Sequence, residues 1–199
     1  PTLDQGLTGT LRLAGLSGSL ASNMVVDRFE ATADLNVALK DSLAEIRKCS
    51  GSLQQAGQPG GTFDVTGSYH LTNRTGELTL KLAGLNQHVL RSFMTAALGE
   101  RKLETVSISA ETSARYDANG AAGAKSSVKI VNLLVTDPQG RLPKVPLTAE
   151  FVLDAALSGQ GVADLKRFTG LIRAADKPAG SFEMSGQYDP TNQTGQVAF

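Results

Sequence analysis

The sequence is poor in the residues that most often carry chemistry. Among 199 residues there is no Trp, one Cys and two His. A single Cys excludes an internal disulfide, and we expect Cys49 to be a buried apolar residue. His70 and His88 have no second ligand at a spacing typical of zinc sites. No phosphate-binding loop and no Ser partnered by a His is visible. We therefore expect no catalytic residue, no metal, no cofactor and no enzyme activity.

The sequence also lacks an excess of charge of one sign and a long apolar run. Nineteen basic residues balance 19 acidic ones, whereas nucleic-acid-binding proteins usually carry a basic surface, so we expect no nucleic-acid partner. No segment approaches the roughly 18 apolar residues of a membrane span. Because the chain begins at Pro1 without Met and ends inside a strand-like run at Phe199, we expect a fragment of a longer protein.

What the sequence does contain is a long internal repeat. Residues 44–80 align with residues 163–199 at a constant offset of 119, and 12 of the 37 pairs are identical. Most of the others are exchanges within one chemical class, such as Asp64 with Glu183. A repeat of this length is typical of extended architectures in which similar units stack side by side.

Alternation of apolar and polar residues predicts that these units are strands. It is clearest over 103–117, where Val106, Ile108 and Ala110 alternate with Ser107 and Ser109. Gly- and Asn-rich turns separate the strand-like segments, as in hairpins. We predict a mainly β fold, in which repeated hairpins form an extended, twisted antiparallel sheet that curls into a trough. One short helix is expected at about 86–98, with Asn86 as N-cap and Gly99 at its end.

The same pattern predicts how the chain is organised. We expect one β-rich unit over 1–199 with internal repeats at about 9–82 and 127–199. A helix and hairpin segment, 83–126, joins them.

Strand alternation also predicts one apolar face, because successive side chains point to opposite sides of a sheet. The residues expected on this face are Leu11, Leu13, Leu78, Leu80, Leu82, Val106, Ile108, Val128 and Ile130. Their neighbours Arg12, Thr79, Lys81, Ser107 and Lys129 should then face water.

Several motifs in this order resemble the AsmA-like family, which includes the TamB-type and YhdP-type bacterial envelope proteins. The run Leu-x-Leu-Ala-Gly-Leu occurs at 11–16 and again at 80–85, a Gly-Ser-Tyr hairpin begins at Gly67, and Gly84-Leu85-Asn86-Gln87 precedes the predicted helix. The resemblance implies a trough with an apolar inner face. It also implies a periplasmic location, anchorage of the parent protein in the inner membrane, and transport of phospholipids between membranes. The family has no fixed binding motif, so no binding residue is carried over.

Two functions therefore remain open at the level of sequence. The first is a non-enzymatic segment of an envelope lipid-transport protein, with phospholipid or another acyl-chain lipid in an apolar groove and membrane contact through other parts of the parent protein. The second is a closed β-repeat module for structure, adhesion or interaction, without lipid cargo. Both need the same alternation of residues, so the sequence does not separate them.

Overall fold

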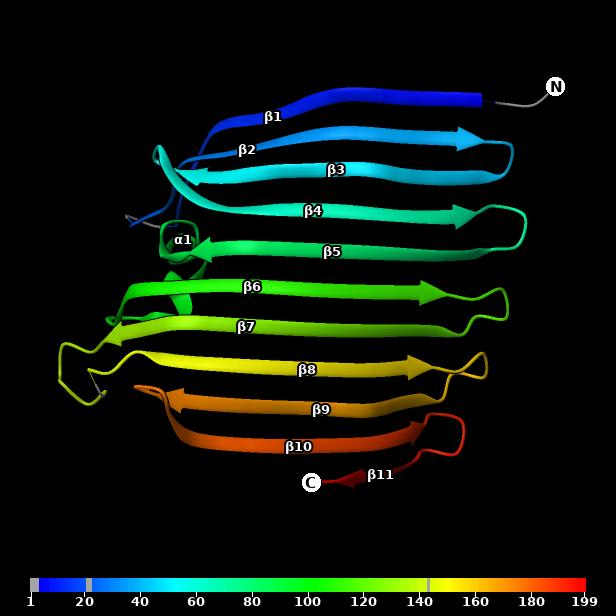
Figure 1. Ribbon diagram of the computed structural model, residues 1–199. Coiled ribbons are helices and arrows are strands. Elements are labelled where there is room, and N and C mark those ends of the chain that lie inside the picture. Colours follow the sequence, from blue (N-terminus) through cyan, green and yellow to red (C-terminus); the bar gives the residue numbers. More distant parts are fainter. Residues whose placement is uncertain (1–3, 21–22, 143) are drawn as a thin grey trace.

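The chain forms one open antiparallel sheet of eleven strands that follow one another in chain order (Figure 1). The computed structural model describes residues 4–20, 23–142 and 144–199. Strands account for 75% of the chain, and one short helix accompanies them, as the alternation pattern predicted. The strands are β1 (Asp4–Leu20), β2 (Asn23–Lys40), β3 (Leu43–Gln55), β4 (Gln58–His70), β5 (Thr75–Asn86), β6 (Lys102–Tyr116), β7 (Ala122–Thr136), β8 (Leu147–Leu157), β9 (Ala163–Ala174), β10 (Lys177–Asp189) and β11 (Thr194–Ala198).

The strand registers reproduce the offset of 119 seen in the sequence. Phe63 on β4 pairs with Gly51 on β3, and Phe182 on β10 pairs with Gly170 on β9. Tyr69 pairs with Gly76, and Tyr188 pairs with Gly195. The turns agree as well, because Arg74 and Gln193, also 119 residues apart, both adopt left-handed backbone with φ of 53° and 52°. The repeated sequence thus forms repeated hairpins.

A bulge recurs near one end of three strands. The register shifts between Leu13 and Leu16 on β1, and between Leu82 and Leu85 on β5, so the two Leu-x-Leu-Ala-Gly-Leu runs make the same structure. In both, the glycine has positive φ, 69° at Gly15 and 64° at Gly84. β7 contains a similar shift between Ile130 and Leu133, with Asn132 at φ 54°. Such bulges bend a strand and increase the local twist.

The helix α1 (Gln87–Leu98) lies between β5 and β6, as predicted. Asn86 caps its N-terminus, because Asn86 Oδ1 accepts a hydrogen bond of 3.0 Å from the backbone N–H of His88. Gly99 follows its last residue with φ 59°, the left-handed conformation that commonly ends a helix. The local sequence therefore determines both ends of α1.

α1 packs against one end of the sheet (Figure 1). Val89, only 3% exposed, lies over Gly60 of β4, where an added Cβ would collide with its side chain. The ring of Phe93 meets that of Phe29 on β2 edge to face, with the centroids 6.2 Å apart. On the sheet, Phe29 shares a face with Ala31, two residues along the same strand. The helix therefore covers one end of that face.

Most of the sheet carries no second layer among the described residues. The accessible surface is 12714 Å², whereas a folded monomer of 20.8 kDa usually exposes about 9,000 Å². Among the residues that the structure describes, five apolar residues are buried, three of them Val89, Leu103 and Val106. The molecule is a single sheet whose two faces are both largely open.

Candidate functional site

The candidate site is the sheet face that the nine predicted apolar residues share. Hydrogen-bonded partners in adjacent strands lie on the same face, so a row can be followed across the sheet. The central row runs from β1 to β10 through Leu11, Ala33, Gly51, Phe63, Leu82, Ala110, Val128, Phe151, Gly170 and Phe182. Ten consecutive strands thus contribute only apolar residues or glycine to this row.

The other predicted residues lie in rows parallel to the central row. Leu13, Ile108 and Ile130 are nearer to α1, whereas Leu80 and then Leu78 are farther from it. Val106 is 5% exposed and lies beside α1, where its backbone N–H donates to Gln87 Oε1 at 3.3 Å. Leu11 and Leu78, by contrast, are 62% and 44% exposed. The structure therefore brings all nine residues to one face and covers the end at Val106.

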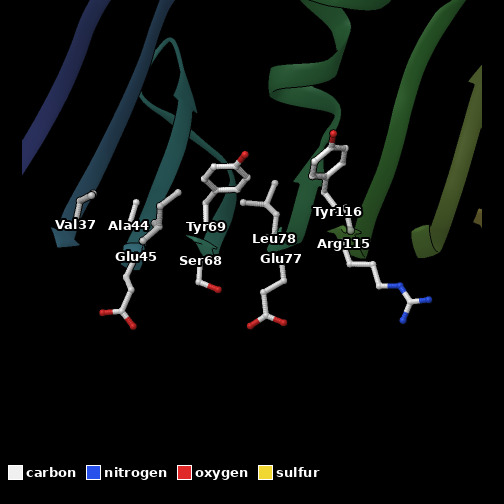
Figure 2. Close-up of a pocket in the computed structure, with 13 residues that line it drawn as sticks. Val37, Ala44, Glu45, Ser68, Tyr69, Glu77, Leu78, Arg115 and Tyr116 are labelled. Carbon is white, nitrogen blue, oxygen red and sulfur yellow. The ribbon is translucent and has the colours of Figure 1, made fainter. Parts of the chain in front are cut away.

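A groove of about 340 Å³ hollows this face at the end away from α1. Tyr69 and Tyr116 stand on either side of Leu78, and Val37 and Ala44 continue the apolar lining (Figure 2). In the same view Glu45, Ser68, Glu77 and Arg115 point to the opposite side of the sheet. Gly67 and Gly76 also line the groove and lack side chains that would fill it.

The opposite face is polar and carries ion pairs between neighbouring strands. Lys81 Nζ lies 3.2 Å from Glu111 Oε1, and Lys129 Nζ lies 3.2 Å from Glu150 Oε1. Arg12 pairs with Glu30 at 3.1 Å. Exposed pairs of this kind contribute little stability, about 0–1 kcal/mol each. The side chains of Arg12, Lys81 and Lys129 are 67%, 58% and 58% exposed, and they lie opposite the apolar residues.

The predicted set missed the aromatic residues of the apolar face. Phe63, Phe151 and Phe182 belong to the central row, and Phe168 contacts Phe182 with the ring centroids 5.0 Å apart. The prediction considered only some of the strands. The same alternation, followed through 62–71 and 147–157, would have found Phe63 and Phe151.

Cys49 also lies on the apolar face, paired with Leu35 on β2 and Val65 on β4. It is half-buried rather than buried, because no second layer covers its part of the sheet. The expectation that Cys49 is buried was therefore wrong, although its apolar surroundings were predicted correctly.

The described part of the chain contains no candidate metal site. Over residues 4–20, 23–142 and 144–199, no three His, Cys, Asp or Glu residues are placed to hold a metal ion. The pKa of Glu104 is lowered by hydrogen bonds from Lys102 and Thr136, and that of Asp189 by hydrogen bonds from Asn192 and Thr191. Glu104 therefore stabilises the end of the sheet near α1, and Asp189 stabilises the turn between β10 and β11.

Fold and face together define the class of molecule: an open antiparallel β-sheet with one continuous apolar face and one polar face. No protein-family model, curated protein or solved structure matches the chain. No helix within the described residues is long and apolar enough to cross a membrane.

Proposed function

We propose that the chain is a non-enzymatic segment of a lipid-transport protein, and that its apolar face conducts phospholipid or another acyl-chain lipid. The observation that supports this most strongly is the central row, which is apolar across ten consecutive strands and open to the surroundings. Soluble monomers rarely expose a continuous apolar patch larger than a few hundred Å². A surface of this extent needs an apolar occupant.

An acyl chain suits such a surface because the central row offers no directional contacts. This row presents aliphatic and phenyl groups and glycine, and hydrophobic burial is non-directional. Burial of one CH₂ contributes about 0.8 kcal/mol. A chain of about 16 carbons, shielded on one side only, would therefore gain roughly 6 kcal/mol. Contacts of this kind hold a lipid without fixing it at one position, which transport along the sheet requires.

The two-sided character of the sheet supports the same function. A polar face with ion pairs such as Lys81–Glu111 stays in water, so only one side is available to lipid. The open row of strands also provides a path longer than one lipid. Eleven strands at about 4.8 Å spacing extend over roughly 48 Å, which exceeds the thickness of a bilayer with its headgroups.

The cellular setting follows from the resemblance to the AsmA-like family. We place the chain in the bacterial periplasm, as part of an envelope protein that is anchored in the inner membrane through parts of the parent protein and contributes to outer-membrane biogenesis. Phospholipid is then the natural cargo. No catalytic residue, cofactor or nucleic acid has a role in this function.

Gentle purification followed by native mass spectrometry tests the proposal. We expect the chain to carry phospholipid, identified by the mass difference and by extraction. A chain that is free of lipid and assembles with its apolar faces in contact would contradict the proposal and favour the structural or interaction module.

A further inference from the structure

All three tyrosines of the chain lie in a single row of the apolar face. Tyr69 on β4 pairs with Gly76, and Gly76 pairs with Tyr116 on β6. From Tyr116 the row continues through Ala122, Leu157 and Ala163 to Tyr188 on β10. The sequence contains three Tyr in total. We call this row, from Tyr69 to Tyr188, the tyrosine row.

The tyrosine row marks the edge of the apolar face at the hairpin turns. Tyr116 is the last residue of β6, whereas Tyr69 and Tyr188 are the next-to-last residues of β4 and β10. All three are well exposed, at 38%, 44% and 51% for Tyr69, Tyr116 and Tyr188. Tyrosine combines an apolar ring with a polar hydroxyl and gathers where one end of a side chain is in water and the other in an apolar layer.

The phenylalanines of this face lie farther from the hairpin turns than the tyrosines do. Phe63, Phe151 and Phe182 lie in the central row, six residues along their strands from the tyrosine row. Beyond the central row, Phe29 packs against Phe93 of α1. The face is therefore graded along the strands, from hydroxyl-bearing rings at the turns, through phenyl rings, to a helix that covers the far end.

We propose that the tyrosine row holds the polar end of a diacyl lipid, and that the acyl chains lie along the strands toward α1. This inference rests on the proposed function and adds an orientation to it. Tyr69 and Gly61 lie eight residues apart on β4, which corresponds to about 26 Å at roughly 3.3 Å per residue. That length exceeds one leaflet of hydrocarbon, roughly half of a 30 Å core, so it accommodates an acyl chain.

The contact made by the tyrosine row is with the ester and glycerol region rather than with a charged headgroup. Tyrosine hydroxyls donate hydrogen bonds to carbonyl oxygens and accept them from hydroxyls. The turns beyond the row carry charges of both signs, with Lys40 and Arg74 set against Asp41 and Asp117. Such a mixture gives no preference for the charge of the headgroup, so lipids that share a diacylglycerol part are equivalent ligands.

Two tryptophan reporters on one strand test the orientation, because the chain has no Trp of its own. Leu157→Trp places a reporter in the tyrosine row and leaves all three tyrosines intact. Phe151→Trp places the matched reporter in the central row, on the same face of β8 and about 20 Å away. Each variant is mixed with phosphatidylcholine vesicles whose acyl chains carry bromine, a quencher of Trp fluorescence, either near the headgroup or near the methyl end.

Bromine near the headgroup should cause the larger loss of fluorescence at residue 157, and bromine near the methyl end the larger loss at residue 151. Equal quenching by both lipids, or the reverse order, would overturn the orientation while leaving lipid binding in place. Absence of quenching at both positions in folded variants would overturn the proposed function itself. The same two reporters are then placed in a chain with the changes Tyr69→Phe, Tyr116→Phe and Tyr188→Phe. There the difference in quenching between residues 157 and 151 should shrink, and an unchanged difference would exclude a role for the hydroxyls.

Discussion

The ring of Phe63 occupies the space above Gly51 on the neighbouring strand. A Cβ on Gly51 would lie 2.7 Å from Phe63 Cζ and would also collide with the carbonyl oxygen of Thr32. The same relationship recurs 119 residues later between Phe182 and Gly170. An aromatic ring that covers a glycine across a strand pair compensates for the contacts that glycine lacks. The repeat therefore reproduces this side-chain contact as well as the strand register.

Gly51→Ala should destabilise the fold by about 1–3 kcal/mol, the usual cost of forcing extra volume into a packed position. Gly180→Ala is the matched control, because an added Cβ there meets nothing within 4 Å. Urea denaturation of both variants measures the difference. Equal stabilities would show that the Phe63 ring does not depend on the absence of a side chain at residue 51.

The contact between Gly60 and Val89 predicts a strong coupling between β4 and α1. Val89→Ala should cost about 2 kcal/mol, because it removes buried methyl groups and leaves a cavity. Gly60→Ala should also destabilise the protein, because its Cβ would collide with the Val89 side chain. In the double variant the second change should cost much less, which a double-mutant cycle by denaturation measures. Additive effects would contradict the packing of α1 on this face.

A pH dependence of stability follows from Glu104, on β6 near α1. Hydrogen bonds from Lys102 and Thr136, together with the charges of Lys102 and Arg91, hold the pKa of this carboxyl below its ordinary value. Arg91 of α1 donates to the carbonyl oxygens of Leu103 and Glu104 at 2.6 Å and 3.2 Å. A lowered pKa in the folded state means that ionised Glu104 stabilises the fold above its unfolded-state pKa, and that this contribution is lost as pH falls through the folded-state pKa.

Glu104→Gln should therefore lower stability at neutral pH and have progressively less effect in acid. Chemical denaturation of the wild-type chain and the variant across the acid range measures the difference. A difference that stays constant from neutral pH down to acid would contradict the role of the ionised carboxylate.

Much of the fold was predictable from sequence because its determinants are local. Strand alternation identified the apolar face, and Asn86 and Gly99 identified the ends of α1. The offset of 119 predicted which residues occupy equivalent positions in the two repeats, including Cys49 and Phe168. These features depend on neighbours along the chain or on repetition, both of which a sequence displays directly.

Coverage of the face was not predictable, because it depends on contacts between segments far apart in sequence. The sequence alternates in the same way around Val106 and around Leu78. In the structure, however, α1 covers Val106 and leaves Leu78 exposed. The half-buried state of Cys49 has the same origin. The tyrosine row was also missed, since it becomes visible only when the registers of β4, β6 and β10 are known.

The repeat makes a further prediction for Cys49, whose counterpart is Phe168. Cys49→Phe should be tolerated within about 1 kcal/mol, because the open face above residue 49 leaves room for a ring and the equivalent site already holds one. Thermal denaturation compares it with the wild-type chain. A severe loss of stability would mean that the two repeats differ in their packing at this position.

The most direct test of the central claim compares Leu80 with Thr79, adjacent residues on opposite faces of β5. A photo-crosslinking residue at either position, in the full-length parent protein, reports what each face contacts. We expect lipid adducts from position 80 and none from position 79. We also expect Leu80→Asp to impair lipid transport, because an unpaired carboxylate in hydrocarbon is strongly unfavourable, while Thr79→Asp remains nearly silent. Equal crosslinking and equal phenotypes at the two positions, or adducts to protein alone from position 80, would contradict the lipid-conducting face.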